Sequence, residues 1–403
     1  MTDPIKARIA ELTPELVRLR RDFHQHPELG FQEHRTAEVV ERYLADLGLE
    51  TRRMADTGVV ALIEGRRPGP VLLLRADMDA LPITEETGVD YKSCNDCVMH
   101  ACGHDAHIAM LLVAAKVLVE HRDRLDGTVK LVFQPNEEIA GAIRMIDEGL
   151  LTGPDVDAAM AIHIWTPLPS GQMAITAGTV MGGLDVFKLT IFGQGGHTGY
   201  PECAVDPIIA AAGVIQAVQT IQTREISHLQ STIIMFGKIA GGTKSNIIPE
   251  SVSLEGSIRF LYKGGPDSEE QPTERFKRVV EGVCRTHRCT SEIEIEHENI
   301  PLINDDRMVA IAREAAGEVT GDPRQIVDTR TIASEDFSEI TARVPGVFIF
   351  VGTGNEAKGT CFPHHNPRFN IDEDTLPLGA EILVRGAFHF FKGADSITAG
   401  PFP

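Results

Sequence analysis

Long hydrophobic runs are missing from the sequence, and the first residues, Met-Thr-Asp-Pro-Ile-Lys, lack the apolar core of a signal peptide. A membrane-spanning helix needs about 20 consecutive apolar residues, and a secretory signal needs a shorter apolar stretch near the N-terminus. Cysteine is also sparse, because only seven cysteines, an odd number, are scattered along the chain. We therefore expect a cytoplasmic protein that does not enter a membrane and whose thiols are mostly reduced.

Basic residues are outnumbered by acidic ones. The sequence has 38 Lys and Arg against 58 Asp and Glu, so its formal net charge is −20. This balance argues against nucleic acid or an anionic membrane as the main partner. An anionic small substrate would be repelled at long range, and it would therefore need a local cationic pocket.

The fold class follows from length and from the alternation of short apolar runs with helical periodicity. A chain of 403 residues is too long for one ordinary core, so we expect two domains. Short strand-like runs precede helical stretches, which predicts an α/β fold with a mixed, mainly parallel sheet. The helical stretches that we expect in this part are residues 4–21, 35–47, 105–121, 139–149 and 306–318.

From about residue 185 the pattern changes to alternating, half-exposed strands. A β-α-β-β-α order, with its first helix expected over 206–223 and a possible closing strand at 291–297, fits a small α+β domain inserted into the larger one. The pair Gly182-Gly183 marks the crossing into it. We therefore predict a first domain made of residues 1–184 and 298–403, interrupted by a second domain at 185–297.

The most informative stretch reads Cys-Val-Met-His-Ala-Cys-Gly-His-Asp-Ala-His and spans residues 97–107. Cys102 and His104 are separated by one glycine, so that a thiolate and an imidazole can converge on one ion. Thiolate, imidazole and carboxylate together suit zinc and similar divalent ions. The alternative is a polar loop that leads into a helix. Cys94 and Cys97 have the spacing of a redox motif, but no thioredoxin-like strand precedes them, which favours free thiols.

Acids and histidines follow the apolar strand-like runs. Asp77 follows one run, the adjacent pair Glu137 and Glu138 follows the next, and His163 follows a third. Each alone is explained by a turn, a helix cap or a core histidine. In parallel sheets, however, ligands bind beyond the carboxyl ends of the strands. The pattern therefore predicts one shared site, in which adjacent glutamates point to opposite sides.

A glycine-rich loop at residues 193–199 contains His197. No helix-opening Lys-Ser/Thr follows, so a phosphate-binding loop of the Walker type is excluded. We interpret the glycines as allowing His197 to approach another group closely. Asn246 and Arg259 are candidates for gripping a carboxylate, Arg259 through two parallel hydrogen bonds; the alternative is that both are ordinary surface residues.

Taken together, these motifs resemble peptidase family M20, in particular its aminoacylase, hippurate hydrolase and auxin-conjugate hydrolase type. The matching segments occur in the family's order over nearly the whole chain. They are Asp22-Phe-His-Gln-His-Pro-Glu-Leu-Gly30, Arg75-Ala-Asp-Met-Asp-Ala-Leu-Pro82, Met99-His-Ala-Cys-Gly-His-Asp105, Phe133-Gln-Pro-Asn-Glu-Glu138, Gly195-Gly-His197, Asn246-Ile-Ile-Pro249, Ser334-Glu-Asp-Phe337 and His365-Asn-Pro367.

The resemblance implies a catalytic domain interrupted by a ferredoxin-like lid or dimerisation domain, and a homodimer or higher homo-oligomer. It implies two divalent metal ions per subunit, zinc or manganese in the first place and cobalt or nickel as alternatives. It further implies that Glu137 is the general base and that Asp77 orients a ligand or supports the metal shell. The metal ligands that it implies are Cys102, His104, Glu138, His163 and His365.

The same resemblance implies hydrolysis of N-acyl amino acids to a carboxylic acid and a free amino acid. His197 would reach across a dimer interface into the partner's site, while Asn246 and Arg259 would hold the substrate's carboxylate. A dipeptidase or carboxypeptidase acting on short peptides is the alternative. A non-catalytic binding protein of this fold is disfavoured, because no ligand and no base is lost from the sequence.

Three departures from the family pattern affect these expectations. Cys97 stands where relatives commonly have glycine, close to the metal loop. Residues 198–202 read Thr-Gly-Tyr-Pro-Glu instead of a more usual Ala-Ala-x-Pro-His, which concerns substrate preference. His364 stands where relatives often carry an apolar residue, so that His364 and His365 both remain possible as the last ligand.

Overall fold

The computed structural model describes residues 3–262 and 271–393, and these form two compact units. Of the described residues, unit 1 contains 3–180, 303–330 and 336–393, and unit 2 contains 181–262, 271–302 and 331–335. The predicted crossings after residues 184 and 297 fall near the observed ones after 180 and 302. Sequence reasoning did not anticipate that the short segment 331–335 is grouped with unit 2.

Unit 1 is built on an eight-stranded sheet with the order β1-β2-β4-β3-β5-β16-β6-β15. Strands β4, β3, β5 and β16 run parallel to one another at its centre, whereas β1–β2, β2–β4 and β16–β6 are antiparallel pairs. The predicted mixed, mainly parallel sheet is therefore confirmed. Its strands are β1 (Thr51–Met54), β2 (Gly58–Glu64), β3 (Val71–Asp77), β4 (Thr128–Gln134), β5 (Ala158–Pro169), β6 (Met173–Ala174), β15 (Ile326–Val327) and β16 (Gly346–Gly354).

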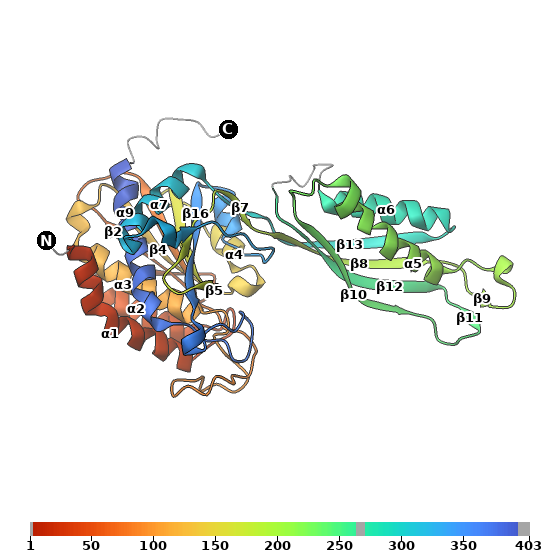
Figure 1. Ribbon diagram of the computed structural model, residues 1–403, viewed down its shortest axis with the longest axis horizontal. Coiled ribbons are helices and arrows are strands. Elements are labelled where there is room, and N and C mark those ends of the chain that lie inside the picture. The colour runs from red at the N-terminus through yellow and green to blue at the C-terminus, as the bar shows by residue number, and fades with distance from the viewer. Residues whose placement is uncertain (1–2, 263–270, 394–403) are drawn as a thin grey trace. The chain divides into compact units, whose positions relative to one another are not determined.

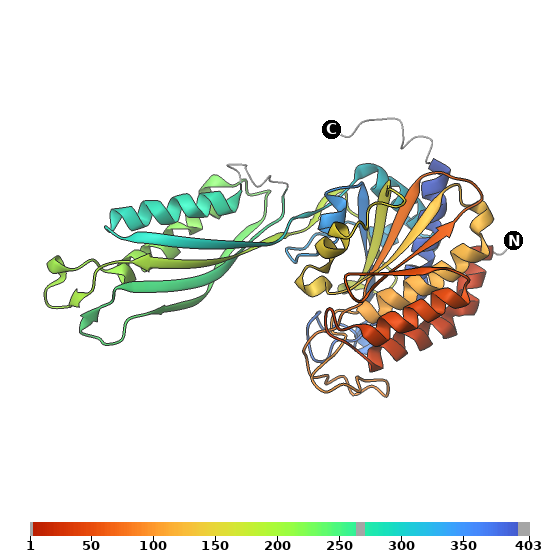
Figure 2. The same ribbon diagram turned by 180° about the vertical axis from the view of Figure 1, so that it is seen from behind.

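The main helices of unit 1 cover the sheet. Helix α3 contacts α1 and α9, and α9 in turn contacts α7 (Figures 1 and 2). Apolar side chains of these helices and of strands β2 to β5 and β16 form one core, in which nearly every residue of α3 is buried. The helices are α1 (Pro4–Gln25), α2 (His34–Asp46), α3 (His104–Glu120), α4 (Gly141–Asp147), α7 (Asp306–Thr320), α8 (Ser338–Thr341) and α9 (Leu376–Gly393).

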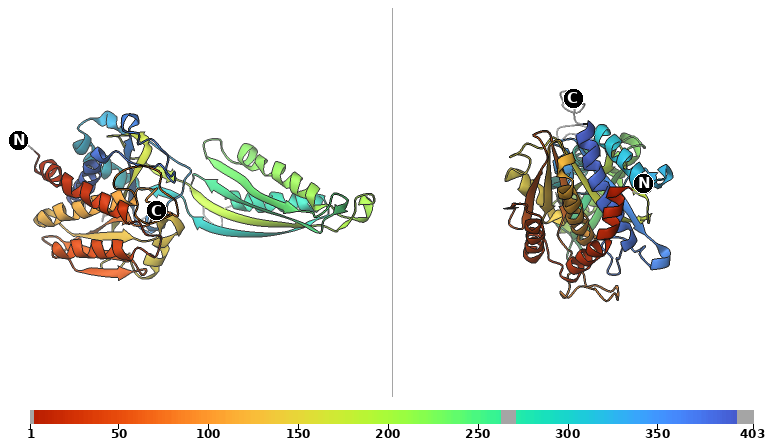
Figure 3. Two further views of the ribbon diagram at one scale, coloured as in Figure 1. Left: turned by 90° about the horizontal axis from the view of Figure 1, so that it is seen from below. Right: turned by 90° about the vertical axis from the view of Figure 1, so that its left-hand side faces the viewer.

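Unit 2 has a four-stranded antiparallel sheet with the order β10-β12-β8-β13. Helices α5 and α6 pack against it and against each other (Figure 3). Phe187 and Phe276 lie at the centre of this core, with ring centroids 4.5 Å apart. The elements are β8 (Gly183–Phe192), β9 (Gly196–His197), α5 (Pro207–Ala217), β10 (Thr232–Gly241), β11 (Ile247–Ile248), β12 (Ser251–Phe260), α6 (Pro272–Thr286) and β13 (Thr290–Asn299).

The predicted element order of both units is confirmed, with two corrections. The helix expected over 206–223 ends at Ala217, and a separate helical turn covers 221–225. The strand that was expected to end before His163 continues to Pro169, because β16 pairs with it along that length. Among the described helices, none combines the length and the apolar content that crossing a bilayer requires.

Candidate functional site

The candidate site lies in unit 1, where strand ends and loops bring metal-type side chains together. Strand β3 ends at Asp77, β4 ends at Gln134, and His163 lies on β5, the other neighbour of β3. The metal loop, residues 97–103, leads into α3. Gly103 there has φ +89, and a Cβ would meet Ile164 Cδ1 at 2.4 Å, so only glycine fits between the loop and β5.

His104, the first residue of α3, is fully buried with one ring nitrogen committed to the protein. Its Nδ1 lies 2.9 Å from the carbonyl oxygen of Asp79, which only accepts, so Nδ1 carries the proton. Its Nε2 is buried and has no hydrogen-bond partner among the residues that the structure describes. Although burial alone would lower it, the carboxylates of Asp77, Asp79 and Glu138 raise the pKa of His104 to about 10. The surroundings of Nε2 therefore favour a positive charge.

His163 completes a first group with Cys102 and His104. Its Nδ1 donates to the carbonyl of Ile164 at 2.6 Å, and its Nε2 lies 3.5 Å from Cys102 Sγ. Burial holds the pKa of His163 well below its usual value, so the ring is neutral. One ligand atom from each of the three residues lies within 4.8 Å of the others. A neutral imidazole with its second nitrogen fixed by a carbonyl is the usual form of a histidine ligand.

A second group consists of Cys102, Glu138 and His365. His365 Nε2 lies 3.1 Å from Glu138 Oε1, but that oxygen is buried and makes no aligned hydrogen bond. The backbone N–H of His365 donates to the carbonyl of Ala101 at 2.8 Å, which ties the C-terminal loop to the metal loop. The structure thus brings His365 to the ligand groups.

His364 is placed differently, although it is the neighbour of His365. Its Nε2 donates to the carbonyl of Ile164 at 3.1 Å, and its ring stacks on Trp165 with centroids 4.6 Å apart. Burial lowers the pKa of His364 to about 3. Its one proton is therefore already used by a carbonyl, and His364 packs beside the groups without joining them.

The two groups fit a pair of divalent ions. Cys102 belongs to both, and the buried atoms His104 Nε2 and Glu138 Oε1 have no hydrogen-bond partner within the described chain. Such orphaned atoms are costly in a buried site unless a further group satisfies them. The donor set of one thiolate, three imidazoles and one carboxylate is one that zinc, manganese, cobalt or nickel accepts.

Glu137 lies beside the ligands without belonging to either of these two groups. It is buried, and one of its oxygens lies within 4.8 Å of ligand atoms of His104 and Glu138. The backbone N–H of Asp336 donates to Glu137 Oε1 at 3.4 Å. The adjacent glutamates lie in a short 3-10 turn, Glu137–Ile139, and both come close to His104, so the extended alternation that the sequence suggested for them is wrong.

Asp77 is hydrogen-bonded to residues that surround the predicted ligands. Its Oδ1 accepts from His107 Nδ1 at 2.6 Å, and His107 Nε2 in turn accepts from the backbone N–H of Ile164 at 2.9 Å. Arg75 donates to its other oxygen at 2.7 Å. Burial alone would raise the pKa of Asp77, but His104, Arg75 and the hydrogen bond from His107 hold this pKa well below its usual range. Asp77 is thus placed to orient its neighbours.

Several supporting residues were missed by sequence reasoning. The Asp79 carboxylate accepts from His104 Nδ1 and from the backbone N–H of Glu138, the latter at 3.1 Å. Only Asp77 was singled out from that motif. His24 is buried between Asp105 and Glu85, whose carboxylate oxygens lie 2.7 and 3.3 Å from its two ring nitrogens. The position of Asp79 two residues after Asp77, on the same face of an extended segment, was the available signal.

Unit 2 contains the predicted substrate-binding residues, but it does not gather all of them. His197 on β9 is exposed and pairs with Ile247 on β11, next to Asn246. A cavity of about 680 Å³ is lined by both His197 and Asn246. Arg259 lies near the other end of β12, roughly 27 Å from Ser251 at a rise of about 3.4 Å per residue. Asn246 and Arg259 of one chain are therefore not neighbours.

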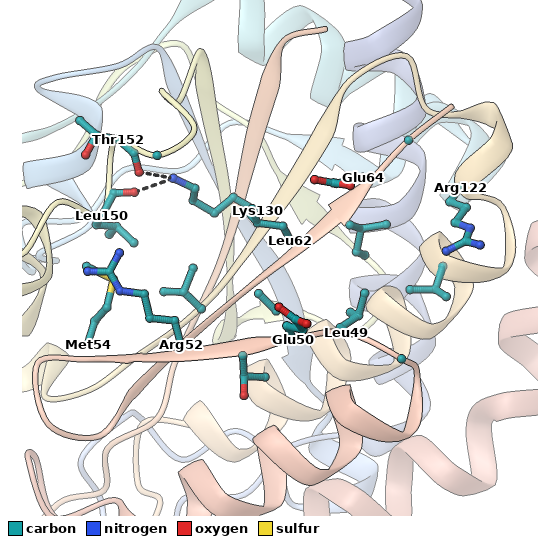
Figure 4. Close-up of a pocket in the computed structure, with 18 of the residues that line it drawn as sticks. Leu49, Glu50, Arg52, Met54, Leu62, Glu64, Arg122, Lys130, Leu150 and Thr152 are labelled. Carbon is teal, nitrogen blue, oxygen red and sulfur yellow. Dashed lines mark hydrogen bonds between the residues drawn. The ribbon is translucent and has the colours of Figure 1, made fainter. Parts of the chain in front are cut away.

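A larger cavity in unit 1, of about 870 Å³, is not the candidate site (Figure 4). Its described lining contains neither Glu137 nor any of the five predicted ligands. Lys130, its buried cation, donates to the carbonyls of Leu150, Thr152 and Pro154 at 2.9, 3.0 and 2.7 Å. All three protons of the ammonium group are therefore used within the protein, and the lysine fastens the segment after α4.

Comparisons with known proteins agree with this geometry. Residues 73–388 match the family described as peptidase family M20/M25/M40. The chain is 36% identical over 387 residues to thermostable carboxypeptidase 2 of Saccharolobus solfataricus, covering 94% of this chain and 96% of the relative. It is 38% identical over 384 residues to N-acetyl-L-cysteine deacetylase of Bacillus subtilis, covering 94% of this chain and 89% of the relative.

A solved structure is similar over almost the whole length. The YXEP protein of Bacillus subtilis, described as a dinuclear metal binding peptidase from the M20 family, superposes with a TM-score of 0.83. It is 32% identical, and the match covers 95% of this chain and 99% of that one. Sequence and fold together show that this chain belongs to peptidase family M20/M25/M40.

Proposed function

We propose that the protein hydrolyses the amide bond of N-acyl amino acids and releases a carboxylic acid and a free amino acid. The observation that carries this proposal is the pair of ligand groups that share Cys102, with Glu137 beside them. The deacetylase relative from Bacillus subtilis supports an N-acyl amino acid as the substrate. The dinuclear metal binding relative supports two ions per subunit.

Amide hydrolysis needs a better nucleophile than water and a way to hold the charge of the tetrahedral intermediate. Bound divalent ions supply both, since they acidify water and polarise a carbonyl. Cys102, His104 and His163 would hold one ion, and Cys102, Glu138 and His365 the other. We expect zinc or manganese, with cobalt or nickel as alternatives.

Glu137 is the proposed general base. It takes the proton from the attacking water and passes it to the nitrogen of the leaving amine, which turns a poor leaving group into a free amino acid. Asp336 N–H and the buried surroundings keep its carboxylate directed into the site. Such proton transfer contributes on the order of 100- to 10,000-fold in rate.

The remaining assignments concern unit 2. We propose that His197 stabilises the developing oxyanion, and that Asn246 and Arg259 bind the substrate's carboxylate. Because Asn246 directly precedes β11 while Arg259 lies near the far end of β12, the two residues of one chain can serve one substrate only if a second copy contributes. This supports a homodimer or higher homo-oligomer, in which His197 acts in the partner's site. The proposed location is the cytoplasm.

The proposal is tested by metal analysis joined to amine-release assays on acetyl, benzoyl, longer acyl and indole-acetyl amino acids and on dipeptides. Glu137→Gln should keep its metal and lose at least about 100-fold in kcat, because the base is gone while the ligands remain. Glu138→Gln, the adjacent change, should lose metal. Wild-type turnover in Glu137→Gln, or no amine release from any N-acyl amino acid, contradicts the proposal.

The carboxypeptidase relative from Saccharolobus solfataricus supports a second candidate, hydrolysis of short peptides. The same centre would cleave the bond, and only the acyl side of the substrate would differ. The substrate panel separates the two functions. If dipeptides release amine at a kcat/KM at least tenfold above the best N-acyl amino acid, the protein is a peptidase.

A further inference from the structure

The segment from Asn136 to Ala142, which carries Glu137 and Glu138, has an unusual backbone. Asn136 has φ +53 and Ala140 has φ +62, so two residues that bear a Cβ adopt the left-handed conformation. Asparagine tolerates this conformation, but it is unfavourable for alanine, and such strain persists at functional sites only where the surroundings enforce it. The base-bearing segment therefore needs anchors.

Three buried carboxylates accept hydrogen bonds from three backbone N–H groups of this segment. The N–H of Asn136 donates to Glu33 Oε1 at 2.9 Å. The N–H of Glu138 donates to Asp79 Oδ2 at 3.1 Å, and the N–H of Ala142 donates to Asp336 Oδ2 at 2.8 Å. The carboxylates of Glu33 and Asp336 thus hold the two ends, just outside the pair of glutamates.

Both end anchors are themselves held firmly. Asp336 is completely buried, and it accepts from Arg75 Nη2 at 3.0 Å and from Gln134 Nε2 at 2.8 and 2.9 Å. Glu33, also completely buried, accepts from Thr57 Oγ1 at 2.6 Å. Buried carboxylates that are fully hydrogen-bonded have a fixed geometry, because any movement would leave a charge without a partner.

We propose that Glu33 and Asp336 are positioning residues that clamp the strained segment and thereby set the position of Glu137. The inference rests on the proposed function, in which Glu137 is the base. Neither residue belongs to the two ligand groups that share Cys102. Asp336 acts twice, since its side chain holds Ala142 while its backbone N–H meets Glu137 Oε1.

The direct test is Asp336→Asn. An asparagine has one acceptor oxygen where the carboxylate has two, so it cannot serve Ala142, Gln134 and Arg75 together. A misplacement of about 1 Å at a catalytic group costs on the order of 100-fold in rate. We expect kcat to fall at least tenfold, with KM within threefold of wild type and two ions still bound. Glu33→Gln should show the same split between kcat and KM.

A second variant separates positioning from general stability. Glycine adopts φ +62 without strain, so Ala140→Gly should relax the segment and restore kcat of Asp336→Asn at least threefold. Ala55 provides a matched control, because it is also left-handed, with φ +47, but lies between β1 and β2. Ala55→Gly removes the same kind of strain elsewhere and should restore no activity.

A further control is Asp372→Asn, which changes another buried carboxylate that accepts from Ser170 and Asn355 at 2.9 and 2.8 Å. It should leave kcat within twofold of wild type. The clamp is overturned if Asp336→Asn keeps kcat within twofold, if its loss follows lost metal, or if Ala55→Gly rescues as well as Ala140→Gly. Should Asp336→Asn fail to fold, Glu33→Gln with and without Ala140→Gly decides by the same criteria.

The proposed function fails in a different way. If wild-type protein releases no amine, or if Glu137→Gln is fully active, the base assignment is wrong. If Glu137→Gln is inactive while Asp336→Asn and Glu33→Gln are normal, only the clamp is wrong.

Discussion

The ligand groups of unit 1 and the tip of unit 2 around His197 are built in opposite ways. Three of the five predicted ligands are each fixed by a backbone carbonyl oxygen. His104 and His163 donate to it from the side chain, and His365 donates from its backbone N–H. At the tip, His197 and Asn246 are exposed, and His197 Nδ1 accepts only from Gly199 N–H, at 2.9 Å. The residues proposed to hold the ions are thus preorganised by backbone contacts. The residues proposed to contact the substrate lie on an exposed surface that can adapt.

The largest effect should come from removing the thiol that belongs to both ligand groups. Cys102→Ala should lose both ions and reduce kcat by at least about 1,000-fold, because metal chemistry depends on the complete shell. Metal content by mass spectrometry checks this, and Cys361→Ala, an exposed cysteine, is the control. Retention of both ions by Cys102→Ala would contradict the assignment.

Replacing each of the two adjacent histidines in turn tests which of them is a ligand in unit 1. His365→Ala should lose one ion and at least about 100-fold in activity, since it removes a direct ligand. His364→Ala should keep both ions, because its Nε2 is used by the carbonyl of Ile164. Metal titration of the two variants measures the difference. The opposite result would make His364 the ligand.

Substitutions at the tip of unit 2 should lower kcat without changing the metal content. His197→Ala should reduce kcat by about 100- to 1,000-fold, the usual cost of losing an oxyanion-stabilising group. Metal content should stay at the wild-type value, and a loss of metal would break the comparison between the regions.

Subunit mixing tests whether His197 acts in trans. Inactive His197→Ala and inactive Glu137→Ala subunits, once exchanged, should regain part of the activity through hybrid dimers. Absence of recovery after verified exchange would place His197 in its own subunit's site.

The smallest functional effect is expected at a buried charge outside both regions. Lys130→Met should lower the free energy of unfolding by about 3 kcal/mol, because it leaves three carbonyls without a charged donor. Activity of the folded protein should be unchanged. Lys116→Met, which removes a partly exposed ion pair with Glu15 at 2.8 Å, should cost under about 1 kcal/mol. Urea denaturation compares the two, and equal losses would contradict the role of burial.

Sequence patterns predicted the parts of the site that are local in the chain. Cys102 and His104 are two residues apart, and Glu137 and Glu138 come three and four residues after the end of β4, so spacing marked them as candidates while the family resemblance supplied their roles. Strand ends of parallel neighbours meet at one edge, which also made His163 predictable. The α/β architecture and the element order of unit 2 followed from periodicity in the same way.

The remainder depended on contacts between distant segments. Asp336 meets Arg75 across 261 residues and Glu33 meets Asn136 across 103, and neither pairing leaves a mark on local spacing. The separation of Asn246 from Arg259 was also invisible, because a strand's sequence does not tell which end will carry a pocket. The left-handed conformation of Ala140 could not be predicted, since alanine rarely adopts it.

The shared position of Cys102 has a consequence for the lifetime of the enzyme. A thiol oxidised to sulfinic acid is lost as a ligand, and that step is not reversed by ordinary reductants. Because Cys102 serves both ligand groups, a single oxidation would empty the whole centre instead of half of it. Bound metal would then protect the sulfur from oxidation. The apoprotein, and not the metal-loaded enzyme, would therefore be the form that loses activity with time.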